Sequence, residues 1–144
     1  MSRARFKARD LGIDVASGRE REIFKWFLAS FLGGKRISQE IAANTYGVLV
    51  HEHGLDTPAK LCRCPRQRLV RLLGEGRYTR YDESTATRLH ALCRKLREDY
   101  GGRLGHLRRE AGSRAQTRAR LLAFDGVGPK TADIFLREVG PVWF

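Results

Sequence analysis

The sequence predicts an all-α protein, a compact multi-helix bundle or barrel that ends in two helices joined by a tight turn. Three observations support this fold class. Apolar residues recur at helical spacing in every strongly periodic segment, no strand-like alternation persists, and proline and glycine stand where helices would begin and end. The 144 residues are enough for one domain with a core of its own.

We expect the helical domain to span residues 20–144, preceded by a basic N-terminal arm over residues 1–19. The arm starts with several Arg and Lys residues but lacks the apolar run of a secretory signal, so we expect it to be disordered or to touch DNA. No segment approaches the roughly 20 apolar residues that cross a membrane, so no membrane partner is expected.

The first predicted helix covers about residues 20–32, where large apolar side chains form a dense face that ends at Gly33-Gly34. Ser38 has the side chain of a helix N-cap, because its oxygen can accept from a free N–H group of the first turn. The helix that it opens is expected to run to Gly54.

Two proline pairs, Thr57-Pro58 and Cys64-Pro65, each predict the start of a short helix, since proline fits the first helical turn. A longer helix follows over about residues 83–100 and ends at a pair of glycines. Residues 103–113 are polar, basic and interrupted by glycine, which indicates a short helix within a loop.

The last predicted element is a helical hairpin over residues 121–136, with Gly126-Val127-Gly128 at its turn. The glycines allow positive φ and leave no Cβ to hold a ligand away. Pro129 suits the first turn of the second helix, whose unpaired N–H groups would form an anion site beside the positive end of the helix dipole. Lys130 stands at the opening of this site.

This hairpin resembles the helix-hairpin-helix motif of the endonuclease III-like DNA glycosylases of the HhH-GPD superfamily. Gly126-Val127-Gly128 and Lys130-Thr131-Ala132 match the motif, and Asp125 takes the place of its proline. The resemblance implies a double-stranded DNA partner that is damaged or lacks a base. It also implies that Lys130 is the catalytic nucleophile, which attacks the sugar C1′ and forms a Schiff base before the strand breaks by β-elimination.

The sequence departs from this family in two ways. In the family, an aspartate that follows the hairpin stabilises the sugar cation. Here no aspartate follows the hairpin, and Asp133 lies within its second helix. The three cysteines are also too few for the family's four-cysteine iron–sulfur loop. We therefore expect no iron–sulfur cluster, and the resemblance allows a monovalent cation at the hairpin carbonyls. Lyase action at an abasic site does not need this aspartate. It requires only that the Lys130 amine be desolvated. Alternatively, the 144 residues lack C-terminal helices that would complete the enzyme.

The composition points to a polyanionic partner. The 28 Lys and Arg residues exceed the 16 Asp and Glu residues, which gives a formal charge of +12 and a sequence pI of about 10.5. Besides the hairpin backbone and Thr131, the candidate DNA-binding residues lie on two predicted loops. They are Lys35, Arg36, Arg77, Tyr78 and Arg80. Tyr78 could equally be half-buried, and the arginines could simply be solvated.

Two main hypotheses follow. The first is a base-excision-repair protein, a DNA glycosylase or abasic-site lyase, and the second is a non-catalytic module that binds DNA independently of base sequence. A basic helical domain that binds RNA or protein is a third. The odd number of cysteines predicts reduced thiols and an intracellular location, in the cytoplasm or nucleoid. His51 and His53 have no third ligand in view, so no metal site is predicted.

Overall fold

The computed structural model describes residues 6–144, and every regular element among them is helical, as predicted. The α-helices are α1 (Glu20–Gly33), α2 (Gln39–Tyr46), α3 (Pro58–Arg63), α4 (Arg66–Glu75), α5 (Asp82–Tyr100), α6 (Leu104–Ala111), α7 (Arg114–Leu122) and α8 (Pro129–Trp143). Three shorter segments are η1 (Ala8–Leu11), η2 (Val15–Ser17) and the π-helical η3 (Gly47–Glu52).

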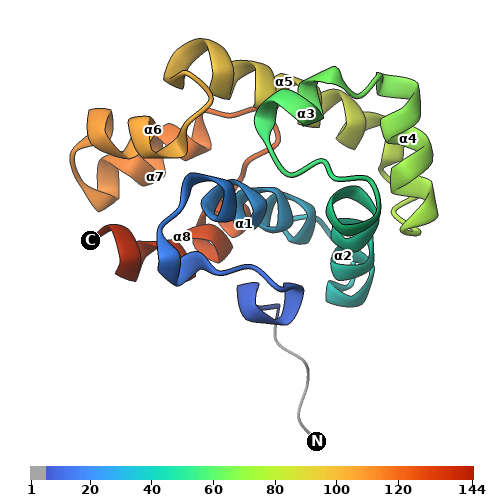
Figure 1. The fold of residues 1–144 in the computed structure, drawn as a ribbon, viewed down its shortest axis with the longest axis horizontal. Coiled ribbons are helices and arrows are strands. Elements are labelled where there is room, and N and C mark those ends of the chain that lie inside the picture. Colours follow the sequence, from blue (N-terminus) through green and yellow to red (C-terminus); the bar gives the residue numbers. More distant parts are fainter. Residues whose placement is uncertain (1–5) are drawn as a thin grey trace, which may run out of the picture.

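Helix α1 lies in the middle of the molecule (Figure 1). Its residues from Glu22 to Gly33 are buried with the exception of Lys25, and the large rings of Trp26 and Phe27 are fully buried. A helix that is apolar all round must be covered on all sides, and α2, α6 and α8 pack against it. The core therefore forms around α1.

The local signals of the sequence appear in the structure as predicted. The Ser38 hydroxyl accepts from the backbone N–H of Ile41 at 3.1 Å and caps α2. The Thr57 hydroxyl accepts from the N–H of Lys60 at 3.2 Å and caps α3, which begins at Pro58. Helix α5 ends where Gly101 adopts a left-handed conformation with φ of 63°.

The predicted boundary of the domain at residue 20 is wrong for the part of the arm that the structure describes. Phe6 and Ile13 are buried in the core, and the backbone N–H of Ala8 donates to the Glu138 carboxylate at 2.9 Å. Arg137 also donates to the carbonyl of Phe6. Residues 6–19 thus pack on α1, where Phe6 lies beside Trp26, and on α8, through contacts between residues that are distant in sequence. Residues 1–5 of the predicted arm lie outside the described part.

The loop between α4 and α5 is held down by Tyr78, which is fully buried. Its hydroxyl donates to the carbonyl of Leu32 at 2.9 Å, near the C-terminal end of α1. Carbonyls in the last turn of a helix lack an intrahelical partner, so the tyrosine satisfies a group that would otherwise be buried unpaired. The expectation that Tyr78 contacts DNA is therefore wrong.

We expect Tyr78→Phe to lower the free energy of unfolding by about 1–3 kcal/mol, because the substitution leaves the Leu32 carbonyl buried without a donor. Denaturant unfolding followed by circular dichroism measures the change. Tyr81→Phe in the same loop is the control, since its half-buried hydroxyl has no hydrogen-bond partner among residues 6–144. Equal losses in the two variants would contradict this role of Tyr78.

Candidate nucleic-acid interface

Helices α7 and α8 form the predicted hairpin, joined by residues 123–128. Gly126 has φ of 82°, a left-handed conformation that glycine adopts without strain, and the N–H of Val127 donates to the carbonyl of Phe124 at 3.1 Å. Gly128 is extended, with φ of −100° and ψ of −175°, and Pro129 is the first residue of α8. Only the first glycine of the motif therefore needs positive φ.

Aromatic contacts fix the hairpin on α1. The Phe124 ring meets Phe27 edge-on with centroids 5.6 Å apart, and Phe135 from α8 meets the same ring at 5.3 Å. At Gly126 a Cβ would stand only 3.0 Å from the Phe31 ring and 2.9 Å from the Arg88 side chain. The turn is thus pressed against α1 and α5 and has little freedom to move.

A second close contact joins α8 to the end of α1. A Cβ at Gly34 would lie 1.9 Å from the hydroxyl oxygen of Thr131, which is only 2% exposed. Val127 is also buried, at 5% exposed. The side chains of Val127 and Thr131 therefore face the protein, so any contact of these residues with DNA is left to their backbone groups.

The start of α8 presents unpaired backbone donors. Within residues 6–144, the N–H groups of Gly128, Lys130 and Thr131 have no protein acceptor, and no side chain caps the helix. By contrast, Ser38, Thr57 and Ser113 cap three other helices through their hydroxyl groups. A glycine N-cap leaves the amides of α8 open to an anion.

Gly128 has open space around it. A Cβ built there meets no atom within 4 Å, and its φ is accessible to any residue. A side chain at Gly128 would therefore not strain the turn. A side chain at this position would instead point into the space where a ligand approaches the amides.

Lys35 reaches the hairpin from the loop between α1 and α2. Its ammonium donates to the carbonyl of Gly126 at 3.2 Å and lies 5.3 Å from the centre of the Phe31 ring. Burial lowers the pKa of Lys35, the neighbouring Arg88 lowers it further, and Asp125 opposes both. The resemblance allows a monovalent cation at the hairpin carbonyls. In this structure the Lys35 ammonium contacts the Gly126 carbonyl instead.

Other basic residues lie on segments that meet at the end of α1. Arg88, which the sequence analysis did not single out, stands 3.9 Å from Asp125 on the hairpin turn. An arginine on the polar face of a helix is common, so the sequence does not mark Arg88 as a site residue until its contact with the hairpin is known. Two loops near the end of α1 carry four more basic residues: one loop contacts the hairpin through Lys35, and the other is tied to α1 by Tyr78. We use the name α1-end surface for Lys35, Arg36, Arg77, Arg80 and Arg88.

The two loops of this surface carry the remaining predicted residues. Arg36 follows Lys35 and is exposed, whereas Arg77 and Arg80 are exposed on the loop that Tyr78 ties to α1. Arg77 has φ of 69°, a strained conformation for a residue with a side chain, and the Arg80 guanidinium lies 5.3 Å from the centre of the Tyr81 ring. The predicted arginines are thus exposed, whereas Tyr78, which lies between Arg77 and Arg80 in the sequence, is buried.

Lys130 lies at the start of α8 rather than on these loops. It is exposed in the first turn of α8 and lines a hollow of about 690 Å³ between α7 and α8, which we call the α7–α8 hollow. The expected desolvation of its amine is therefore absent in the protein alone. Asp133, one turn later, pairs with Arg118 at 3.2 Å.

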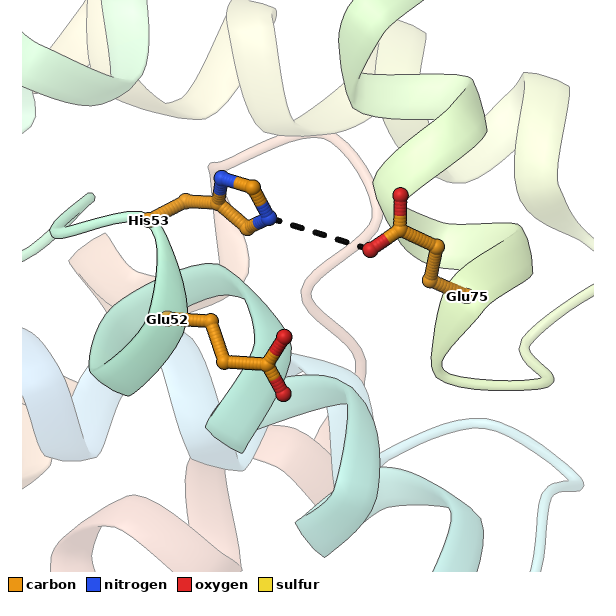
Figure 2. A group of neighbouring side chains, drawn as sticks. All are labelled: Glu52, His53 and Glu75. Atoms are coloured by element: carbon orange, nitrogen blue, oxygen red, sulfur yellow. Dashed lines mark ion pairs between the residues drawn. The ribbon is translucent and has the colours of Figure 1, made fainter.

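A cluster that the sequence analysis missed joins η3 to α4. Figure 2 shows Glu52, His53 and Glu75, whose nearest ligand atoms lie within 4.8 Å of one another. His53 Nε2 lies 3.7 Å from the Glu75 carboxylate, and Arg68 lies 3.3 Å from His53 Nδ1. A guanidinium can only donate, so Nδ1 is the acceptor in the contact with Arg68.

Comparison of the chain with family models, curated proteins and solved structures gives no match. Across the described residues, no helix has both the length and the apolar character needed to traverse a membrane. The functional assignment therefore depends on the geometry of the hairpin and on the charges around it.

The contact between Gly34 and Thr131 gives a direct test of how the hairpin is positioned. We expect Gly34→Ala to lower the free energy of unfolding by about 1–3 kcal/mol, because the added Cβ overlaps the Thr131 hydroxyl. Thr131→Ala in the same chain should recover part of this loss. Thermal and denaturant unfolding measure both.

Gly47→Ala is the matched control for this prediction. Gly47 has helical φ and ψ, and a Cβ there meets nothing within 4 Å, so alanine should be neutral or slightly stabilising. Similar effects at the two glycines, or no recovery with Thr131→Ala, would show that the contact does not hold the hairpin in place.

Proposed function

We propose that the protein binds double-stranded DNA through the phosphate backbone, with the hairpin between α7 and α8 as its central contact. The observation that carries this proposal is the uncapped start of α8, where the N–H groups of Gly128, Lys130 and Thr131 lack acceptors in the described chain. These donors sit beside the positive end of a 15-residue helix, and phosphate oxygens are their natural acceptors.

Two further features support a polyanion as the ligand. The α1-end surface adds five cationic side chains on segments that meet beside the hairpin, and the whole chain carries a formal charge of +12. Such a surface attracts phosphates and releases their counterions, which supplies most of the affinity in sequence-independent binding.

Recognition of the backbone rather than the bases follows from the side chains at the turn. Val127 and Thr131 face inward, and Gly126 and Gly128 have no side chains, so the part of the turn beside the open amides offers only backbone groups. The one exposed polar side chain of the turn, Asp125, lies 3.9 Å from Arg88. The resemblance to the endonuclease III-like hairpin favours duplex DNA over RNA as the partner.

We expect Gly128→Ser to weaken DNA binding about fivefold or more without loss of stability. A serine at the N-cap accepts from the N–H groups of Lys130 or Thr131, so it stabilises α8 and at the same time occupies the donors that would hold a phosphate. Fluorescence anisotropy with a labelled duplex at several salt concentrations, together with thermal unfolding, measures the two effects.

Gly128→Asp should weaken binding further, because its carboxylate also repels the phosphate. The opposite signs on stability and affinity rule out unfolding as the cause of any loss. If Gly128→Ser bound the duplex as tightly as the unchanged protein, the hairpin amides would not be the contact.

A second candidate function is abasic-site lyase activity, and the position of Lys130 favours it. The amine is exposed at the start of α8, next to the proposed phosphate site, so it can reach a sugar of a bound strand. It would attack the C1′ aldehyde, lose water to form a Schiff base, and release the 3′ phosphate by β-elimination. This attack needs a neutral amine, and exclusion of water by a bound strand favours that form of a lysine.

Borohydride trapping on abasic-site DNA tests this second function. We expect a covalent adduct with the unchanged protein, no adduct with Lys130→Ala, and an undiminished adduct with Lys60→Ala, a lysine of α3. An adduct that survives in Lys130→Ala, or no adduct at all, would leave the protein as a binding module alone.

A further inference from the structure

The α7–α8 hollow collects positive charge that the proposed hairpin contact does not use. Besides two aliphatic side chains of α8, its lining is charged. These residues are Arg114, Arg118, Lys130, Asp133 and Arg137. Four cations and one carboxylate thus share a hollow of about 690 Å³.

Only part of this charge is compensated within the protein. Asp133 pairs with Arg118 at 3.2 Å, and Arg137 lies 3.7 Å from Glu138. Within residues 6–144, neither Arg114 nor Lys130 has an ion-pair partner.

Two of these arginines are held in place by contacts within the protein. A Cβ at Gly140 would lie 2.1 Å from the Arg114 guanidinium, so this group lies directly on the backbone of α8. Arg137 is held by its hydrogen bond to the carbonyl of Phe6. Fixed guanidinium groups lose little freedom when they bind an oxyanion, and their fork of donors suits a phosphate.

We infer that the α7–α8 hollow binds a phosphate group of the same DNA strand that contacts the hairpin amides. This inference rests on the proposed function and extends its footprint from the start of α8 onto α7. Lys130 joins the two sites, because its N–H is one of the unpaired donors of the hairpin while its side chain lines the hollow. The strand therefore passes from the α1-end surface, over the hairpin, to the hollow.

Asp133 gives the sharpest test, because its removal should improve binding. Asp133→Asn deletes the one carboxylate of the hollow and releases Arg118 from its ion pair. Asp133 is exposed, so the fold should tolerate the change. We expect about two- to fivefold tighter binding of duplex DNA at 0.1 M salt. The slope of log K against log salt should also steepen by up to about 0.9.

Glu52→Gln is the matched control. It changes the net charge by the same amount at an exposed site on η3, which lies far from α7 and α8 (Figure 1). Arg114→Gln should weaken binding and flatten the salt slope by about one unit, whereas Arg71→Gln on α4 should have a much smaller effect. Thermal unfolding of each variant checks that the fold is retained.

The outcomes separate this inference from the proposed function. If Asp133→Asn and Glu52→Gln tighten binding equally, only net charge matters and the hollow is not a phosphate site. The proposed function then stands as long as Gly128→Ser still weakens binding. If the unchanged protein does not bind duplex DNA in a salt-dependent way, the proposed function fails and this inference fails with it.

Discussion

Burial of α1 on all sides is the constraint on which the rest of the structure depends. Nearly every residue from Glu22 to Gly33 is covered, and the helix ends at Gly33 and Gly34, where Phe6 and Thr131 pack close to the backbone. The hairpin approaches the same point, since Thr131 packs on Gly34 and Phe124 packs on Phe27. The buried helix α1 thereby fixes the turn between α7 and α8 on its protein-facing side. The backbone on the other side of the turn is left open to solvent.

The glycines near this point serve three different purposes. Gly34 is small because the Thr131 hydroxyl occupies the place of its Cβ, and Gly126 adopts positive φ under the Phe31 ring. Gly128 has neither constraint, yet it occupies the N-cap, where a serine or aspartate would stabilise α8. Folding explains the first two glycines. The proposed function gives a reason for the third, because a phosphate bound at the start of α8 would need the amides uncovered.

The elements that could be predicted from the sequence are those specified by neighbouring residues. Helical spacing, the Ser38 and Thr57 caps and the hairpin glycines all act within a few positions, and the structure contains each of them. The burial of Tyr78 and the packing of residues 6–19 depend on contacts with Leu32 and with α8, which are distant in sequence. A tyrosine between arginines has the same local pattern whether its hydroxyl meets solvent or the end of a buried helix.

Lys35 at the hairpin carries a charge that its surroundings in the fold disfavour. Burial and Arg88 both disfavour its charge and lower its pKa, so its ammonium costs stability at neutral pH. The sign follows from linkage. With a folded-state pKa below that of the unfolded chain, this cost is complete below the folded pKa and is relieved as pH rises towards the unfolded value of about 10.4. An apolar side chain would avoid the cost altogether. The charge is accounted for if it faces a phosphate held by the neighbouring amides, since the ion pair would then offset the desolvation that the protein alone does not compensate.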